Sequence, residues 1–240
     1  MKSICSKKNI SVLSLFLLLV TININSQSLS LGTDVVNRYI WRGLKLGGES
    51  PSIQPNIALI SGGFTIGFWG AYPFESTVLE EIDFYSSYTF SLENAGALSV
   101  GFTDYINPNS GTPVFNFNNY NNVNGPGAHY IELNAGYSGP ENFPLSLSVN
   151  VFVYNLKNNP IYFQVGYNTA IDDVGLSIFL GGTPGEDTKY YGVDKFSVIN
   201  TGFTVSKSIK ITESFSLPVF GSLIANPALD NLFYVFGIRL

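Results

Sequence analysis

Apolar and polar residues alternate along nearly the whole chain after residue 26, and this pattern limits the fold more than any other feature. In residues 144–154, Leu145, Leu147 and Val149 lie on one face, while Ser146 and Ser148 lie on the other. A period of two is typical of a β-strand that has one apolar face. The segments with this pattern are residues 28–44, 52–61, 64–72, 82–92, 96–106, 128–138, 144–154, 161–170, 174–181, 196–211, 215–223 and 232–240.

The pattern predicts an all-β protein with about twelve antiparallel strands. The range is roughly ten to fourteen, because residues 28–44 can form either one long strand or two short ones. The phase of the alternation slips near Asn200, which predicts a β-bulge at that point.

Alternation alone does not separate a transmembrane barrel from a soluble β-sandwich, since both have one apolar face. Charged residues make up only 12% of the chain, against the ~25% that is usual for soluble proteins. After residue 26 no apolar run approaches the ~20 residues of a transmembrane helix. Strands that cross a bilayer must close into a barrel, because no backbone group can stay unpaired in lipid. The sequence therefore predicts a transmembrane antiparallel β-barrel, with a secreted β-sandwich or jelly roll as the alternative.

The lengths of the connections between these segments also alternate. Every second connection is tight, as at residues 62–63 and 171–173, whereas the longest ones, residues 107–127 and 182–193, fall in the other set. Short periplasmic turns and longer outer loops are expected of an outer-membrane barrel, with both termini in the periplasm. Aromatic residues near strand ends suit the interfacial girdles of such a barrel; they are Tyr39, Trp41, Tyr72, Tyr88, Phe90, Tyr137 and Tyr167.

The N-terminal 26 residues have the layout of a secretory signal peptide. Lys2, Lys7 and Lys8 precede an apolar run over residues 10–20, and small residues follow that run. This order of basic, apolar and small residues is what signal peptidase substrates share. We therefore expect a signal peptide over residues 1–26 and an outer-membrane barrel over residues 27–240, with a retained anchor helix as the alternative.

Removal of the leader changes the charge and the cysteine content. Three of the 12 Lys and Arg residues lie in the leader, which leaves nine against 17 Asp and Glu residues. This acidic balance excludes a basic patch for nucleic acid. The only cysteine, Cys5, also lies in the leader, so the mature chain has no disulfide and no thiolate metal site.

Charged residues on the polar faces of the strands are the candidate lumen residues. If Leu29, Leu31, Tyr39 and Trp41 face lipid, the intervening charges of that segment face inward. The same phase argument applied to the other strands gives the candidate lumen or constriction residues, which are Asp34, Arg38, Arg42, Asp83, Glu132 and Arg239. Inward charges of both signs can form a network across a narrow lumen. Such a network either shapes a constriction or braces the barrel.

The connection over residues 107–127 is long for a structureless loop. It contains Phe115, Phe117 and Tyr120 among many asparagines. It either folds inward and narrows the pore, binds an external ligand, or forms a hydrated surface loop.

The chain offers little for catalysis. Its only histidine, His129, lies at the outer end of a strand, and a lipid hydrolase would need it beside a serine on a neighbouring strand. The acidic turns at residues 172–173 and 185–187 lack EF-hand spacing. We therefore expect no enzymatic activity, no metal and no cofactor.

Several motifs resemble the opening of the TorF-type porin family. They are DVVNRYIWRGL at residues 34–44, PSIQP at 51–55 and FW at 68–69, and EIDFY at 81–85 and GFTDY at 101–105 are similar to that family's next strands. The resemblance implies a barrel in the outer membrane of a Gram-negative bacterium and a channel role, without a known substrate or catalytic residue. Such barrels commonly end in an aromatic residue, whereas this chain ends in Leu240.

The expected function is therefore a porin-like channel for passive passage of small hydrophilic solutes. The alternatives are an outer-membrane lipid hydrolase that uses His129 and a non-conducting structural or adhesive barrel. The expected partners are outer-membrane lipid, a small solute and the barrel assembly machinery, with no nucleic acid.

Overall fold

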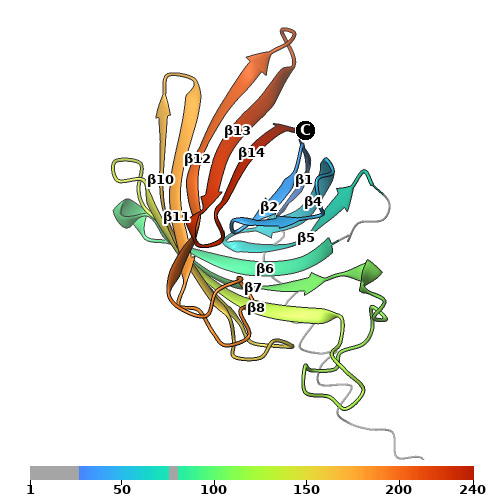
Figure 1. The fold of residues 1–240 in the computed structure, drawn as a ribbon. Helices are drawn as coiled ribbons and strands as arrows, with labels where there is room; N and C mark the ends of the chain where they lie inside the picture. The colour runs from blue at the N-terminus through green and yellow to red at the C-terminus, as the bar shows by residue number, and fades with distance from the viewer. Residues whose placement is uncertain (1–26, 76–80) are drawn as a thin grey trace, which may run out of the picture.

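The computed structural model describes residues 27–75 and 81–240, so the predicted signal peptide lies outside the described residues. Twelve strands form one closed antiparallel barrel, and two short strands form a separate hairpin (Figure 1). The all-β barrel and its strand number are confirmed. In the described part of the chain, no helix is long and apolar enough to cross a membrane.

The barrel strands are β1 (Gln27–Val36), β4 (Ser52–Ser61), β5 (Phe64–Pro73), β6 (Glu81–Ser91), β7 (Ala97–Ile106), β8 (His129–Ser138), β9 (Leu145–Phe152), β10 (Ile161–Ile171), β11 (Val174–Thr183), β12 (Ser197–Lys210), β13 (Ser216–Asn226) and β14 (Asn231–Arg239). Each pairs with its neighbour in this order, and β14 returns to pair with β1. The short strands are β2 (Tyr39–Trp41) and β3 (Leu44–Leu46). The described residues also contain three 3-10 turns, η2 (Glu93–Ala95), η3 (Pro108–Ser110) and η4 (Pro227–Leu229).

The alternation of the sequence becomes the two faces of the barrel wall. On β8, the side chain of Leu133 is 52% exposed on the outside, whereas that of the adjacent Glu132 is 0% exposed inside. Leu31, Phe68 and Phe236 are exposed in the same way on strands around the barrel. The wall therefore presents apolar side chains outward and keeps its polar side chains for the lumen.

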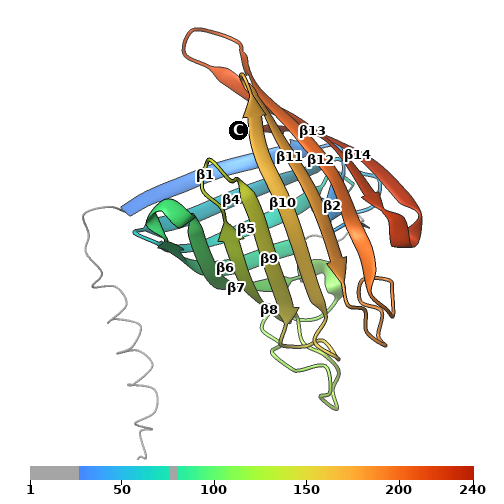
Figure 2. The same ribbon diagram turned by 90° about the vertical axis from the view of Figure 1, so that its left-hand side faces the viewer.

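Tight and long connections lie at opposite ends of the barrel, as predicted (Figure 2). We call one the tight-turn end, where β1 begins and β14 ends. The connections at that end include residues 62–63, 172–173 and 211–215. The other is the long-loop end, where the connections include residues 37–51, 107–128 and 184–196.

Of the two alternatives for residues 28–44, the single long strand is wrong, because the segment contains two separate strands, β1 and β2. β1 ends at Val36, and residues 37–51 form what we call the inner hairpin, which contains β2 and β3. Its two-residue turn, Arg42 and Gly43, has positive φ angles of 50° and 74°. Two positive φ angles are typical of a type I′ hairpin turn, which Asn-Gly usually signals and Arg-Gly does not. The sequence pattern therefore gave no signal for this turn.

This turn also changes the direction in which the first aromatic residues point. Tyr39 and Trp41 were expected on the lipid-facing side, in an interfacial girdle. The structure instead places both on the inner hairpin, where Tyr39 is buried. Tyr72, Tyr88 and Tyr167 do lie exposed on the outside of the barrel.

The predicted bulge near Asn200 is confirmed. Asn200 pairs with Gly181, but the next pair along β11 is Gly182 with Val198, so Ile199 is the extra residue. Ile199 is fully buried and packs with Tyr162 and Tyr191. The bulge thus gives the interior of the barrel an apolar side chain at the long-loop end.

Candidate functional site

The inner hairpin lies inside the barrel at the long-loop end and contacts walls that are far apart in sequence. The Tyr39 hydroxyl donates to Glu81 Oε1 of β6 over 2.9 Å. On another side, Asn226 Nδ2 at the end of β13 donates to the Gly43 carbonyl over 3.2 Å. A Cβ on Gly43 would lie 1.9 Å from the Ile199 carbonyl oxygen. The hairpin therefore crosses the lumen and fits it closely at its tip.

Arg42, at the tip of the hairpin, is the centre of a buried polar network. Its guanidinium donates to both carboxylate oxygens of Glu132, over 2.6 and 2.8 Å. It also donates to the Tyr191 hydroxyl over 2.7 Å. Tyr105 and Asn134 each donate to Glu132 Oε2 over 2.9 Å. The Arg42 and Glu132 side chains are only 11% and 0% exposed, so this is a buried, two-pronged ion pair in a low-dielectric site.

Aromatic rings surround this ion pair and complete the obstruction. The Arg42 guanidinium lies 4.5 Å from the ring centroids of both Trp41 and Tyr162. Trp41 stacks on Tyr191 with a centroid distance of 5.9 Å. Tyr191 belongs to the connection over residues 184–196, where burial raises the pKa of its phenol above the usual range. The hairpin and this connection together fill the lumen at the long-loop end.

A second group of acids lies nearby on β6. Glu81 accepts the hydrogen bond from Tyr39, and Asp83 is buried beside it on the same inward face. Asp83 Oδ1 has no hydrogen-bond partner in the described residues. The lumen therefore places a carboxyl group with spare hydrogen-bonding capacity against the hairpin.

The half of the lumen towards the tight-turn end is open, and its wall carries both polar and apolar side chains. A cavity of about 410 Å³ is lined by residues such as Gln54, Thr204, Ser206 and Ser222, and it adjoins a second one of about 360 Å³. Asp34 and Arg239 lie on its wall, with hydrogen bonds of 2.8 and 2.9 Å between the guanidinium and the carboxylate. Their side chains are 25% and 65% exposed. This pair also joins β1 to β14, so it closes the barrel.

The structure brings together some of the predicted lumen residues and separates others. Asp34 with Arg239, and Arg42 with Glu132, form two pairs inside the barrel. Arg38 lies beyond the end of β1, yet it lines the same cavity as Asp34 and Arg239. It pairs with Glu49 of the inner hairpin over 2.5 Å. Arg38 therefore belongs to the hairpin and not to the barrel wall.

The connection over residues 107–128 lies outside the lumen. Phe117 stacks on the His129 ring, with centroids 3.9 Å apart, and His129 is on the outward phase of β8. Asn155 Nδ2 donates to the Gly127 carbonyl over 2.9 Å, which ties this connection to its neighbour. Phe115 is 88% exposed, and Tyr120 is exposed as well. The structure thus places the obstruction at the inner hairpin and not at the predicted loop constriction of Phe115, Phe117 and Tyr120.

His129 has both of its ring nitrogens engaged. Nδ1 lies 2.7 Å from Asp104 Oδ2, and Nε2 lies 2.7 Å from the Val114 carbonyl oxygen. A catalytic histidine needs one nitrogen free to reach a serine hydroxyl. In this arrangement the histidine joins the loop to the wall.

A comparison with known protein families assigns this chain to one of them. Residues 24–207 match the family model described as a bacterial protein of unknown function, Gcw_chp. The chain belongs to the Gcw_chp family. No curated protein matches it. The match ends at Lys207 in β12, so most of the Gcw_chp barrel, including the inner hairpin and Glu132, lies within the matched residues.

Two residues of this site, Tyr105 and Tyr191, were not identified from the sequence. Tyr105 lies on the inward phase of its strand, so the alternation contained the signal for its contact with Glu132. Tyr191 lies in a connection without periodicity, and no sequence signal places it against Arg42. In the described ranges, no group of three or more His, Cys, Asp and Glu residues is arranged to hold a metal ion.

Proposed function

We propose that this protein is a channel in the outer membrane of a Gram-negative bacterium, through which small hydrophilic solutes pass when the inner hairpin leaves the lumen. The proposal rests on the open cavity in the tight-turn half of the lumen, which has polar and charged groups on its wall and ends at the hairpin. Gln54, Ser206 and Ser222 offer hydrogen bonds to a hydrated solute there, and Asp34 and Arg239 offer both signs of charge. The TorF-type resemblance of the first third of the chain supports the same function.

The outer surface supports placement in a membrane. Large apolar side chains such as Leu31, Leu59 and Leu133 are exposed on strands around the barrel. Soluble monomers rarely expose contiguous apolar patches beyond a few hundred Å². A lipid phase would cover this surface, and the predicted leader and the barrel assembly machinery would deliver the chain there. The protein acts without enzymatic activity or a cofactor in this proposal.

The hairpin can be removed with little disturbance of the wall. Val36 of β1 lies directly opposite Ser52 of β4, so a two-residue turn can replace residues 38–50. In planar bilayers we expect low conductance from the wild type and a severalfold higher conductance from this replacement. Resistance of the folded barrel to cold SDS reports whether each variant has folded.

An independent variant tests whether the buried Arg42–Glu132 ion pair holds the hairpin in the lumen, without deleting the hairpin. The double substitution Arg42→Met/Glu132→Gln removes both buried charges and should raise the frequency of channel opening. The matched control is Lys45→Ala, which removes the ion pair between Lys45 and Glu49 within the hairpin, and Lys45 does not line the cavity. Its conductance should equal that of the wild type.

A non-conducting structural barrel is the second candidate, because the hairpin, Trp41 and Tyr191 fill the long-loop end of the lumen. It predicts no conductance even after residues 38–50 are replaced in a folded, inserted barrel. That result would overturn the channel proposal. A protein that stays soluble without detergent would overturn the membrane location.

A further inference from the structure

The contact between β1 and β14 differs from every other strand pair of the barrel. It has three residue pairs in register, Asp34 with Arg239, Val35 with Ile238 and Val36 with Gly237. On its other side, β1 pairs with β4 over ten. Figure 2 shows β1 running at a steep angle to β12 and β13. The wall therefore has one short seam.

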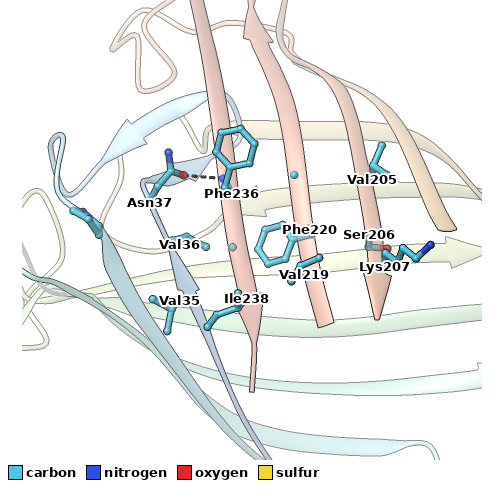
Figure 3. A pocket seen from close by; sticks show the side chains of 13 residues that line it. Val35, Val36, Asn37, Val205, Ser206, Lys207, Val219, Phe220, Phe236 and Ile238 are labelled. Carbon is cyan, nitrogen blue, oxygen red and sulfur yellow. Dashed lines mark hydrogen bonds between the residues drawn. The ribbon is translucent and has the colours of Figure 1, made fainter. Parts of the chain in front are cut away.

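A groove of about 720 Å³ lies at this seam (Figure 3). This volume is in the ~300–1,000 Å³ range of ligand sites. One row of neighbouring residues crosses its four strands, from Val35 through Ile238 and Val219 to Lys207. A second row runs from Phe236 through Gly221 to Val205. Because Gly221 has no side chain, the wall is hollow between Phe236 and Val205.

The groove is apolar along its length and has one cation at its end. Lys207 is the only Lys or Arg on the outward phase of the described barrel strands. It lies near the tight-turn end of β12 and contacts Asp173 of the adjacent turn over 3.1 Å. About half of the side chain is exposed, so its ammonium group retains N–H donors for another acceptor.

We propose that this groove holds one acyl chain of a phospholipid of the periplasmic leaflet, with the lipid phosphate at Lys207. The inference rests on the proposed membrane location. The groove is continuous with the apolar outer face, so an acyl chain can enter it from the bilayer without crossing a polar rim. Its single cation lies at the end of the barrel where the periplasmic head groups would be, and cations near a membrane surface attract lipid phosphates.

Bound lipid would add apolar contacts across the shortest strand pair. Val35 belongs to β1, and Ile238 and Phe236 belong to β14, so one chain in the groove touches both sides of the seam. The acyl chain therefore acts as part of the wall where the paired length of two strands is shortest.

The test is native mass spectrometry of the full-length mature barrel in a neutral detergent, titrated with phosphatidylglycerol. We expect one lipid to stay bound to the wild type. Gly221→Leu fills the hollow and should abolish retention. A Cβ at this position meets Phe236 ring carbons at 3.4 and 3.6 Å and the Val235 carbonyl oxygen at 4.0 Å, which are ordinary van der Waals contacts, and the rest of the leucine side chain would extend into the groove.

Lys207→Gln is the second variant, and it keeps the test valid if Gly221→Leu does not fold. Loss of a charge-assisted hydrogen bond to phosphate should weaken retention about tenfold. Ala135→Leu on the outward face of β8 is the matched control and should retain lipid like the wild type.

Equal lipid retention by the wild type, Lys207→Gln and Gly221→Leu would overturn the proposal. A lipid-free dimer that Gly221→Leu converts to monomers would also overturn it, because the groove would then be an interface between two copies. Both readings are independent of conductance, so a barrel that fails as a channel can still pass or fail this test. Solubility without detergent, which would overturn the membrane location, is detected before any lipid is added.

Discussion

The two halves of the lumen contain the same kind of ion pair in opposite surroundings. At the long-loop end, Arg42 and Glu132 form a two-pronged guanidinium–carboxylate contact that is almost fully buried. At the tight-turn end, Arg239 and Asp34 form the same contact beside an open cavity. The chemistry is equal, so the difference in burial decides what each pair does.

Burial allows the Arg42–Glu132 pair to hold the inner hairpin in one position. Taking both charges out of water costs so much that the pair contributes little net stability, yet removal of one partner leaves an uncompensated charge. The exposed pair costs little to form and little to break. A hairpin held by Arg42 is therefore stable in one position and unstable in half-released ones, which suits two discrete states of the lumen.

The largest expected effect follows from breaking the buried pair on one side only. Glu132→Gln keeps the shape of the side chain and leaves Arg42 buried without its anion. We expect the free energy of unfolding to fall by about 3–5 kcal/mol. Urea titration in detergent, followed by migration in cold SDS, measures this change.

The double variant Arg42→Met/Glu132→Gln supplies the matched comparison. It removes both charges and should recover most of the lost stability, since an apolar side chain of similar volume replaces the buried cation. If the double variant is as unstable as Glu132→Gln, the loss arises from packing around Glu132 and not from the stranded charge.

A smaller effect is expected from a pair of glycine substitutions, one at each end. Gly43 has φ +74° and its Cβ would meet the Ile199 carbonyl, whereas Gly62 has φ +58° and open space around it. Gly62→Ala should therefore lose only the about 1–2 kcal/mol of a left-handed alanine. Gly43→Ala should lose more, because the hairpin tip must also move away from β12.

Conductance separates these two variants further. A displaced hairpin tip should open the channel more often in Gly43→Ala, and Gly62→Ala should conduct like the wild type. Equal behaviour of the two in both stability and conductance would show that the tip does not fit the lumen as tightly as its geometry indicates.

The two halves of the lumen also differ in how much of their structure the sequence predicts. Alternation predicted the barrel, the strand number, the bulge at Asn200 and the inward positions of Asp34, Glu132 and Arg239. All of these features depend on a local period of two in the sequence, because successive side chains of a strand point to opposite faces of the sheet. The tight-turn half of the lumen is made almost entirely of such positions.

The long-loop half depends on segments without a period. The inner hairpin turns at an Arg-Gly pair that carries no usual turn signal, so Arg38, Tyr39 and Trp41 were assigned to the barrel wall. Tyr191 reaches Arg42 from a connection far along the chain. Long-range packing of irregular segments decides these contacts, and no local pattern reports it.

The smallest effect on stability is expected at the exposed pair. Arg239→Ala should change the free energy of unfolding by no more than about 1 kcal/mol, the usual range for exposed ion pairs. Its effect on selectivity should be larger, because Asp34 is left without its cation on the wall of a confined cavity. In the barrel with residues 38–50 replaced, the reversal potential in a salt gradient should shift toward cation preference, and less so at high salt. Because the replacement removes Arg38, the matched variant of that barrel is Lys210→Ala, which removes a cation at the tight-turn end that does not line the cavity. An equal shift in both variants would mean that the net charge of the end, and not the Asp34–Arg239 pair, sets the selectivity.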